Sequence, residues 1–267
     1  MRFFDKLDAR IKASKSILCV GLDPDVSKLP GGIGIAEFNR EIIAATADFC
    51  CAYKLNFAFY EAAGIEGANA LKDTLKMIPG DIPVIADAKR ADIGNTSRAY
   101  AVAIFDYFRF DAATVNPYMG FDSLQPFIEC DDKGVFILCR TSNPGSADFQ
   151  SLFTIWSGKR RAIFEIVAMK AEEWNTRGNI GLVMGATHID ELGLIRRELP
   201  GMPFLVPGVG AQGGDLAAVI EHGNTSAPGG LIINSSRQII FASSGPDFAS
   251  GAAQVAKSLR DEMDSCR

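Results

Sequence analysis

Short apolar segments recur along the chain between longer stretches that have helical periodicity. Each segment is a run of four or five mostly aliphatic, β-branched or aromatic residues, continuous in hydrophobicity as strands buried on both faces are. We predict eight buried strands in these segments, at residues 17–20, 49–53, 83–86, 112–115, 135–138, 180–184, 203–206 and 230–233.

Eight buried strands that alternate with helices are typical of an α/β protein, and we expect a closed (β/α)8 TIM barrel. A barrel of this kind occupies about 250 residues, so one barrel domain over residues 1–267 accounts for the chain. A doubly wound open sheet has the same alternation and is the alternative. Residues 1–8 indicate an amphipathic helix, and residues 150–177, in the longest interval between strands, indicate an extra helix.

Polar or glycine-rich residues follow nearly every predicted strand. In a barrel the carboxyl ends of all strands meet at one mouth, and active sites are built there from several strand ends. We therefore expect a site formed by residues 21–23, 54–56, 87–89, 116–118, 140–143, 185–187, 208–210 and 234–237.

The composition narrows the class of protein. With a net charge of -5 and no basic block, the chain is expected to bind neither nucleic acid nor a membrane surface. No stretch is apolar enough to span a bilayer, and charges interrupt the N-terminal segment before a signal-peptide core forms. The six cysteines lack metal-ligand spacing and mostly lie in apolar segments. We expect a cytoplasmic protein.

Charged side chains gather at the end of the third predicted strand. Asp87 and Lys89 are two residues apart, so in a regular strand both side chains point the same way. Lys54, at the end of the second strand, can converge on them. Alternating charges keep one another ionised and place fixed charges where a reaction needs them. A solvated strip of ion pairs is the alternative.

Asp92 and Thr96 follow in a loop that enters the next helix. These positions suit a site at the barrel mouth, next to the charged strand end. Alternatively, Asn95 or Thr96 caps that helix, which is a frequent role of such residues.

Two further segments suit parts of a phosphorylated ligand. The glycine-rich turn 207–215 after the seventh strand offers backbone amides, and Arg237 after the eighth offers a guanidinium, at the recurrent phosphate site of this fold. The turn 141–145 offers hydroxyl and amide groups to the edge of a heterocycle. Tight or polar turns are the alternative role of both segments.

Other catalytic arrangements lose support. His188 and His222 are the only histidines, and neither has a plausible triad or a second metal ligand nearby in the sequence. Core, helix-end or surface positions are expected for them. A Gly-x-Ser-x-Gly sequence and a phosphate-binding Walker loop are absent, which disfavours an acyl-enzyme hydrolase and a P-loop kinase.

Taken together, these residues resemble the orotidine 5′-phosphate decarboxylase family. Residues 87–96 are similar to the family's Asp-x-Lys-x-x-Asp-Ile-x-x-Thr segment, and residues 115–120, 140–144, 207–214 and 234–237 are similar to its longer bacterial branch. The resemblance extends from about residue 17 to residue 237. The chain departs from the family at His188-Ile189 and in the longer stretch 223–228, which affects loop geometry rather than the charges.

The resemblance implies a lyase that converts orotidine 5′-monophosphate to uridine 5′-monophosphate and carbon dioxide, the last step of pyrimidine nucleotide synthesis, without metal or organic cofactor. The catalytic residues that it implies are Lys54, Asp87, Lys89 and Asp92, with Lys89 as the proton donor. The substrate-binding residues that it implies are Asp23 for the ribose, Ile93 and Thr96, Ser142 for the pyrimidine, and Gln212 and Arg237 for the phosphate. In the family the last aspartate and the threonine come from the other subunit, which implies a homodimer with Asp92 and Thr96 reaching across.

Two alternatives remain open at this point. A related phosphate-sugar barrel, such as a hexulose-phosphate synthase or a pentulose-phosphate epimerase, shares the Asp-x-Lys strand end but usually needs a divalent metal. A non-catalytic nucleotide-binding barrel needs the glycine-rich turn and Arg237, but not the full array of charges.

Overall fold

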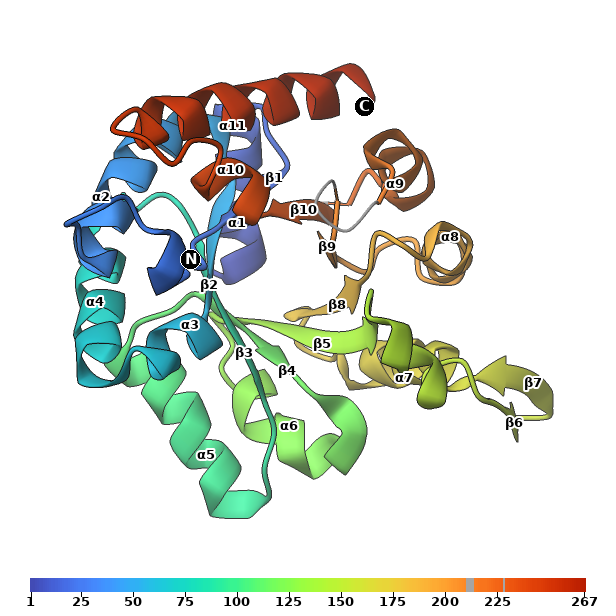
Figure 1. The fold of residues 1–267 in the computed structure, drawn as a ribbon. Coiled ribbons are helices and arrows are strands. Elements are labelled where there is room, and N and C mark those ends of the chain that lie inside the picture. Colours follow the sequence, from blue (N-terminus) through green and yellow to red (C-terminus); the bar gives the residue numbers. More distant parts are fainter. Residues whose placement is uncertain (210–213, 228) are drawn as a thin grey trace.

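The computed structural model describes residues 1–209, 214–227 and 229–267. At its centre is a closed barrel of parallel strands in the order β1-β10-β9-β8-β5-β4-β3-β2 (Figure 1). The barrel strands are β1 Leu18–Gly21, β2 Ala52–Asn56, β3 Val84–Arg90, β4 Ala112–Val115, β5 Gly134–Arg140, β8 Ile180–Met184, β9 Phe204–Pro207 and β10 Leu231–Ser235. Every predicted segment overlaps one of these strands, so the barrel is confirmed and the open sheet is excluded.

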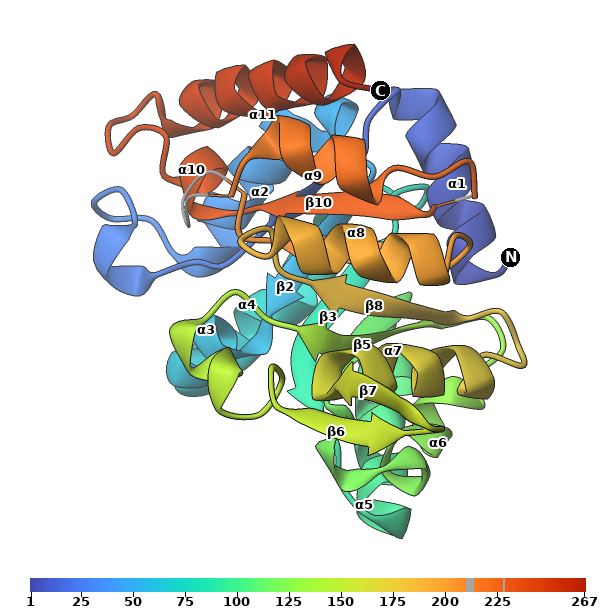
Figure 2. The ribbon, with the colours of Figure 1, turned by 90° about the vertical axis from the view of Figure 1, so that its right-hand side faces the viewer.

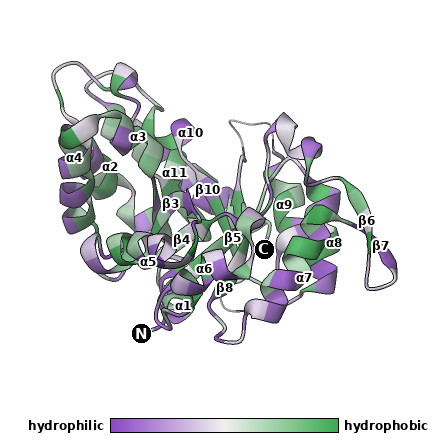
Figure 3. Ribbon diagram, turned by 90° about the horizontal axis from the view of Figure 1, so that it is seen from below, coloured by the Kyte–Doolittle hydropathy of each residue, from purple (hydrophilic) through white to green (hydrophobic). Residues whose placement is uncertain are grey.

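Helices surround the barrel and connect its strands (Figures 1 and 2). The α-helices are α1 Phe3–Ser14, α2 Ile35–Thr46, α3 Phe57–Ala62, α4 Gly64–Met77, α5 Gly94–Val102, α6 Phe121–Ile128, α7 Ile163–Trp174, α8 Ile189–Glu198, α9 Leu216–Gly223, α10 Arg237–Ile240 and α11 Phe248–Ser265. Many carry hydrophobic and hydrophilic residues on different faces, as helices that pack on a barrel do (Figure 3). In the described part of the chain, no helix is both long and apolar enough to cross a membrane.

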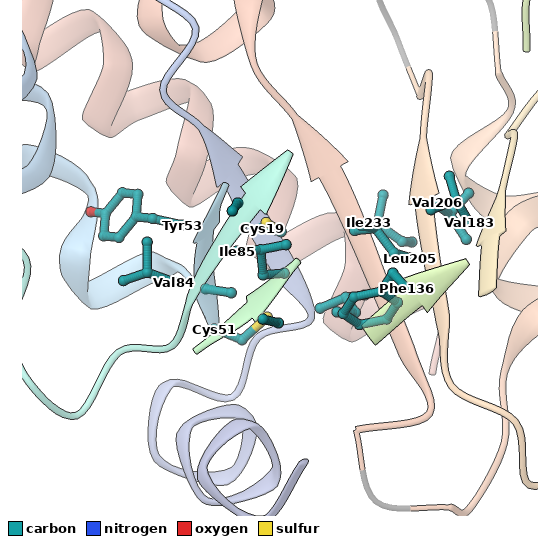
Figure 4. Close-up of a cluster of buried hydrophobic side chains, with 14 of the residues drawn as sticks. Cys19, Cys51, Tyr53, Val84, Ile85, Phe136, Val183, Leu205, Val206 and Ile233 are labelled. Carbon is teal, nitrogen blue, oxygen red and sulfur yellow. The ribbon is translucent and has the colours of Figure 1, made fainter. Parts of the chain in front are cut away.

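The barrel interior is filled with apolar side chains. Figure 4 shows Cys19, Ile85, Phe136, Val183 and Leu205, which come from five different strands and belong to one buried cluster. Because these side chains occupy the barrel, a ligand has room only above them, at the carboxyl ends of the strands.

The N-terminal helix α1 closes the opposite end of the barrel, as the amphipathic pattern predicts. It buries Phe3 and Leu7, and the rings of Phe3 and Phe4 contact Phe136 edge-on at 5.8 and 5.9 Å between centroids. Gly134, the first residue of β5, makes this packing possible, because a side chain at this position would collide with the Phe3 ring.

The prediction of an extra helix over residues 150–177 is only partly right. The helix α7 covers its second half, but the first half forms an antiparallel hairpin of β6 Phe153–Trp156 and β7 Lys159–Ala162. Ser157 and Gly158 form the two-residue turn, and both have positive φ, of 49° and 75°, as hairpin turns of this length require. The hairpin projects from the barrel beyond α7 (Figures 1 and 3).

A buried arginine of α8, Arg196, connects the segments that lie just before the N-terminal ends of β9 and β10. Arg196 is 7% exposed, and its guanidinium packs on the ring of Phe204, the first residue of β9, at 3.8 Å from the centroid. The guanidinium donates hydrogen bonds to backbone carbonyl oxygens only, those of Leu199, Pro200, Met202, Gly223 and Gly230. One side chain thereby holds together the segments that precede β9 and β10.

Arg196→Met is expected to lower the free energy of unfolding by about 3 kcal/mol or more, because the carbonyls stay buried without a donor. Arg196→Lys keeps the positive charge but not the planar array of donors, and is expected to cost less. Urea denaturation of the wild-type protein and both variants measures the difference. Unfolding curves of Arg196→Met and wild type that coincide would contradict this role.

Candidate active site

A cavity of about 300 Å³ lies at the mouth of the barrel and is lined by residues of seven barrel strands and by Asp23, two residues after β1. Of the residues that were predicted individually, Asp23, Lys54, Asp87, Lys89, Ser142 and Arg237 line it. Of the eight strand ends that were expected to form the site, 116–118 and 185–187 contribute no lining residue. Side chains that lie between positions 23 and 237 of the sequence are therefore brought together by the barrel around a space that suits a small molecule.

Two ammonium groups and one carboxylate form a continuous ionic contact at one side of this cavity. Lys54 Nζ lies 2.5 Å from Asp87 Oδ2, and Lys89 Nζ lies 2.5 Å from Asp87 Oδ1. The side chains of Lys54 and Asp87 are only 4% and 10% exposed, whereas that of Lys89 is 47% exposed. Asp87 is thus shared by a buried lysine beneath it and a lysine that reaches into the open cavity.

The contacts keep the buried groups ionised. Burial alone would raise the pKa of Asp87, but the charges of Lys54 and Lys89 outweigh it and hold that pKa well below its ordinary value. Burial alone would lower the pKa of Lys54, but the carboxylates of Asp23 and Asp87 hold it above its ordinary value. The cavity therefore carries fixed charges of both signs at neutral pH.

Asp23 lies beside this ionic contact, just after β1. It is 9% exposed, and its Oδ1 accepts a hydrogen bond from the backbone N–H of Asn56 at 3.2 Å. Gly21 leaves room for Ser236, the residue after β10, because a Cβ at position 21 would lie 2.6 Å from the Cβ of Ser236. The carboxylate of Asp23 is held at the wall of the cavity.

Asp87 and Lys89 meet as the sequence predicts, but the strand that carries them is not regular. Lys89 has a φ of +49°, in the left-handed region that non-glycine residues rarely adopt. The pairing of β3 with β4 is also shifted between Ala86 and Arg90. The contact predicted from strand alternation is present, but an irregular backbone brings it about.

The turn after β5 places a hydroxyl at the cavity. Ser142 Oγ is buried and has no hydrogen-bond partner within the described residues. Its neighbour Thr141 is clamped by the amide of Gln150, whose Oε1 accepts from the Thr141 N–H at 2.8 Å and whose Nε2 donates to Thr141 Oγ1 at 2.9 Å. A fixed turn thus presents an unsatisfied hydroxyl to a ligand.

Arg140, the last residue of β5, supports this turn from behind. It is 4% exposed and donates to Glu191 Oε2 at 2.6 Å and to Ser146 Oγ at 2.5 Å. Burial and the charge of Arg140 lower the pKa of His188, which lies 3.3 Å from the guanidinium. The two histidines occupy helix ends, as expected, with His188 before α8 and His222 in the last turn of α9.

Of the residues that were predicted to bind a phosphate, the structure describes those at positions 207–209, 214–215 and 237. Gly208 has a φ of +98°, and it lines the cavity with Val209 and Arg237. Arg237 is exposed and forms no ion pair with the described carboxylates. Gln212 lies outside the described residues, as does Pro228 of the loop 223–228.

Asp92, Ile93 and Thr96 are not among the described residues that line the cavity of this chain. Ile93 and Thr96 are exposed, and Asp92 is half-buried. Thr96 does not cap α5, since Ile93 is the N-cap residue and no side chain caps this helix end. The alternative capping role of Asn95 or Thr96 is therefore wrong.

Three polar residues at the end of β10 belong to the strand end 234–237 that was expected at the site, but only Arg237 of this segment was predicted to contact a ligand. Asn234 Oδ1, Ser235 Oγ and Ser236 Oγ are buried without a hydrogen-bond partner among the described residues, and all three residues line the cavity. Buried polar atoms without a partner are costly and uncommon. Three successive polar residues at the end of a buried strand were the available signal. Within the described residues, no group of three or more His, Cys, Asp or Glu side chains is placed to hold a metal ion.

Comparison with known proteins gives one consistent family. The family model described as "Orotidine 5'-phosphate decarboxylase / HUMPS family" matches residues 16–250. The chain is 54% identical over 267 residues to the orotidine 5′-phosphate decarboxylase of Dehalococcoides mccartyi, covering 100% of this chain and 99% of that protein. It is 49% identical to that of Halorubrum lacusprofundi, with 100% of both covered. The structure of Leishmania donovani OMP decarboxylase is similar at a TM-score of 0.87 and 41% identity, covering 100% of this chain and 99% of that one.

The lowered pKa of Asp87 predicts how stability depends on pH. Its ionised form favours the folded state, so its contribution to the free energy of unfolding is present above the pKa of an unfolded aspartate, about 3.9, and is lost as pH falls toward the lower folded value. Wild type is expected to exceed Asp87→Asn by about 3 kcal/mol near neutral pH, and this difference is expected to shrink below about pH 4. Denaturation of both proteins across this range measures it. A difference that is the same in acid as at neutral pH would exclude the ionic contact as its source.

Proposed function

The chain belongs to the orotidine 5′-phosphate decarboxylase / HUMPS family, and on this premise we propose that its cavity converts orotidine 5′-monophosphate to uridine 5′-monophosphate and carbon dioxide, the last step of pyrimidine nucleotide synthesis. The protein is a carboxy-lyase. The observation that carries the mechanism is the contact of Lys54, Asp87 and Lys89, which places an ammonium group in the open cavity next to a fixed carboxylate.

The reaction breaks the bond between C6 of the pyrimidine and its carboxylate. The electron pair of that bond remains on C6 as carbon dioxide leaves, so the site has to stabilise negative charge at this carbon and then supply a proton. Lys89 does both in this proposal: its ammonium group faces the developing charge and transfers a proton to C6. The neutral amine that remains regains a proton from solvent, for which its exposure of 47% is favourable.

Asp87 and Lys54 act on Lys89 and on the substrate carboxylate. Asp87 is fixed in its ionised form, so it orients Lys89. It also repels the substrate carboxylate beside it, and this repulsion is relieved when carbon dioxide leaves. Lys54, buried beneath Asp87, keeps that carboxylate charged and in place. Asp92 is proposed to complete the alternating array from a second subunit.

The remaining contacts bind parts of the substrate that do not react. Asp23 is assigned to the ribose, Ser142 to the pyrimidine, and Arg237 with Gln212 to the phosphate, while Ile93 and Thr96 complete the substrate-binding set. Two observations support these roles. Among the described residues, the Ser142 hydroxyl has no hydrogen-bond partner and the Arg237 guanidinium has no ion-pair partner. Binding energy from the remote phosphate can then position the base for reaction.

A homodimer is part of this proposal. The segment that carries Asp92 and Thr96 lies outside the cavity of its own chain and has an apolar surface, with Ile93 60%, Val102 49% and Tyr107 61% exposed. Several exposed apolar residues within one segment favour contact with another protein surface. In a second copy, this segment would bring Asp92 and Thr96 to the cavity of the partner.

The two alternatives have less support. The family model alone does not separate a decarboxylase from related phosphate-sugar barrels, but relatives at 54% identity that are named orotidine 5′-phosphate decarboxylase favour decarboxylation. A non-catalytic nucleotide-binding barrel has no need of a buried lysine that keeps an aspartate ionised. We place the reaction in the cytoplasm, because six free thiols suit a reducing compartment.

Lys89→Ala is expected to lower kcat for orotidine 5′-monophosphate by at least about 10³-fold, because it removes both the proton and the charge that stabilises C6. Its Kd for uridine 5′-monophosphate is expected to stay within about tenfold of the wild-type value, since the phosphate and ribose contacts remain. Single-turnover kinetics and calorimetric titration measure the two effects.

Arg237→Ala is the matched control, because it removes one charge from the same cavity at a distance from the reacting bond. It is expected to weaken product binding by about tenfold or more and to leave most of kcat at saturating substrate. Near-normal turnover by Lys89→Ala would refute the proposed role of Lys89. Equal losses of kcat and of product affinity in both variants would contradict separate roles of Lys89 in catalysis and of Arg237 in phosphate binding.

A further inference from the structure

A buried threonine on β4 faces the irregular part of β3. Pairing of the two strands stops at Ala86 and resumes at Arg90, which corresponds to an advance of only two residues on β4. Residues 87–89 therefore stand opposite a single residue, Thr114, which is 2% exposed. The backbone ladder cannot serve three residues from one position, so a side chain has to take part.

The Thr114 hydroxyl takes this part. Its Oγ1 accepts a hydrogen bond from the backbone N–H of Lys89 at 3.0 Å and donates one to Asp87 Oδ1 at 3.1 Å. The direction of both bonds is fixed, because a backbone N–H only donates and an ionised carboxylate only accepts. One hydroxyl thereby links the main chain of Lys89 to the side chain of Asp87.

Both linked groups need support. Lys89 has a φ of +49°, a conformation that costs about 1–2 kcal/mol for a residue with a side chain. Asp87 Oδ1, which accepts from Thr114, is also the oxygen that contacts Lys89 Nζ at 2.5 Å. Thr114 thus holds two points: the backbone from which the Lys89 side chain begins, and the oxygen Asp87 Oδ1 that its ammonium group contacts.

We propose that Thr114 is a positioning residue for proton transfer, whose hydroxyl holds the Lys89 main chain and Asp87 Oδ1 in the relation that aims the Lys89 ammonium group at the reacting carbon. This inference rests on the proposed function of the site. Lys89 has a long flexible side chain, and without an anchored backbone and a fixed acceptor its ammonium group samples many positions.

The test compares variants that differ by the hydroxyl alone. Thr114→Val keeps the branched shape and removes the oxygen, and it is expected to lower kcat roughly 10- to 100-fold while Kd for uridine 5′-monophosphate changes less than about twofold. Thr114→Ser keeps the hydroxyl and is expected to retain kcat within about threefold of wild type.

A second matched pair covers the case in which Thr114→Val does not fold. Thr114→Ala and Thr114→Ser differ by one oxygen atom, so kcat of Thr114→Ala is expected to lie roughly tenfold or more below that of Thr114→Ser at equal product affinity. A purely structural role of the threonine would lower the thermal midpoint without separating kcat from product affinity.

Three results would overturn the inference: Val and Ser variants with the same kcat, a Val variant with wild-type kcat, or a Val variant whose product affinity falls as far as its kcat. Wild-type turnover is measured in the same assay. No turnover by the wild-type protein would instead refute the proposed function, so the two failures are distinguishable.

Discussion

The ionised carboxylate of Asp87, held between two ammonium groups, is the interaction on which the rest of the site depends. A carboxylate that is 10% exposed stays charged only because Lys54 and Lys89 each lie 2.5 Å from it. Lys54 is in turn stabilised by Asp23 as well as by Asp87. Loss of Lys54 or Asp87 leaves the other without its buried counter-charge, so these two groups stabilise each other in the folded protein.

The barrel provides what this unit requires. The strand β2 pairs with both β1 and β3, so that Asp23, Lys54 and Asp87 share one wall of the cavity. The packed interior below excludes water from Lys54 and strengthens its attraction to the carboxylates. Further contacts support the site: Thr114, which also lines the cavity, donates to Asp87, and Gln150 and Arg140 hold the Ser142 turn from behind. In the proposed mechanism these neutral and paired groups hold the reacting charges still.

Buried strands could be predicted because their hydrophobicity is continuous, and the strand ends because polar residues there interrupt it. The hairpin 153–162 was missed although four residues that favour strands, Phe153 to Trp156, precede the turn Ser157-Gly158. The length of the interval between the fifth and sixth predicted strands suggested a helix instead. The left-handed Lys89 and the contacts of Thr114 and Gln150 could not be predicted, because they depend on register shifts and on side chains that are distant or irregularly spaced along the chain. Asp92 and Thr96 remain predictions, as one chain does not bring them to its cavity.

The most direct test of the central claim is to add orotidine 5′-monophosphate to chelator-treated protein and to follow the ultraviolet absorbance of the substrate. A site whose chemistry depends on the fixed charges of Lys54, Asp87 and Lys89 is expected to consume the substrate fully, with uridine 5′-monophosphate and carbon dioxide formed in equal amounts. No reaction in the absence of added metal would contradict this account and favour a related phosphate-sugar barrel.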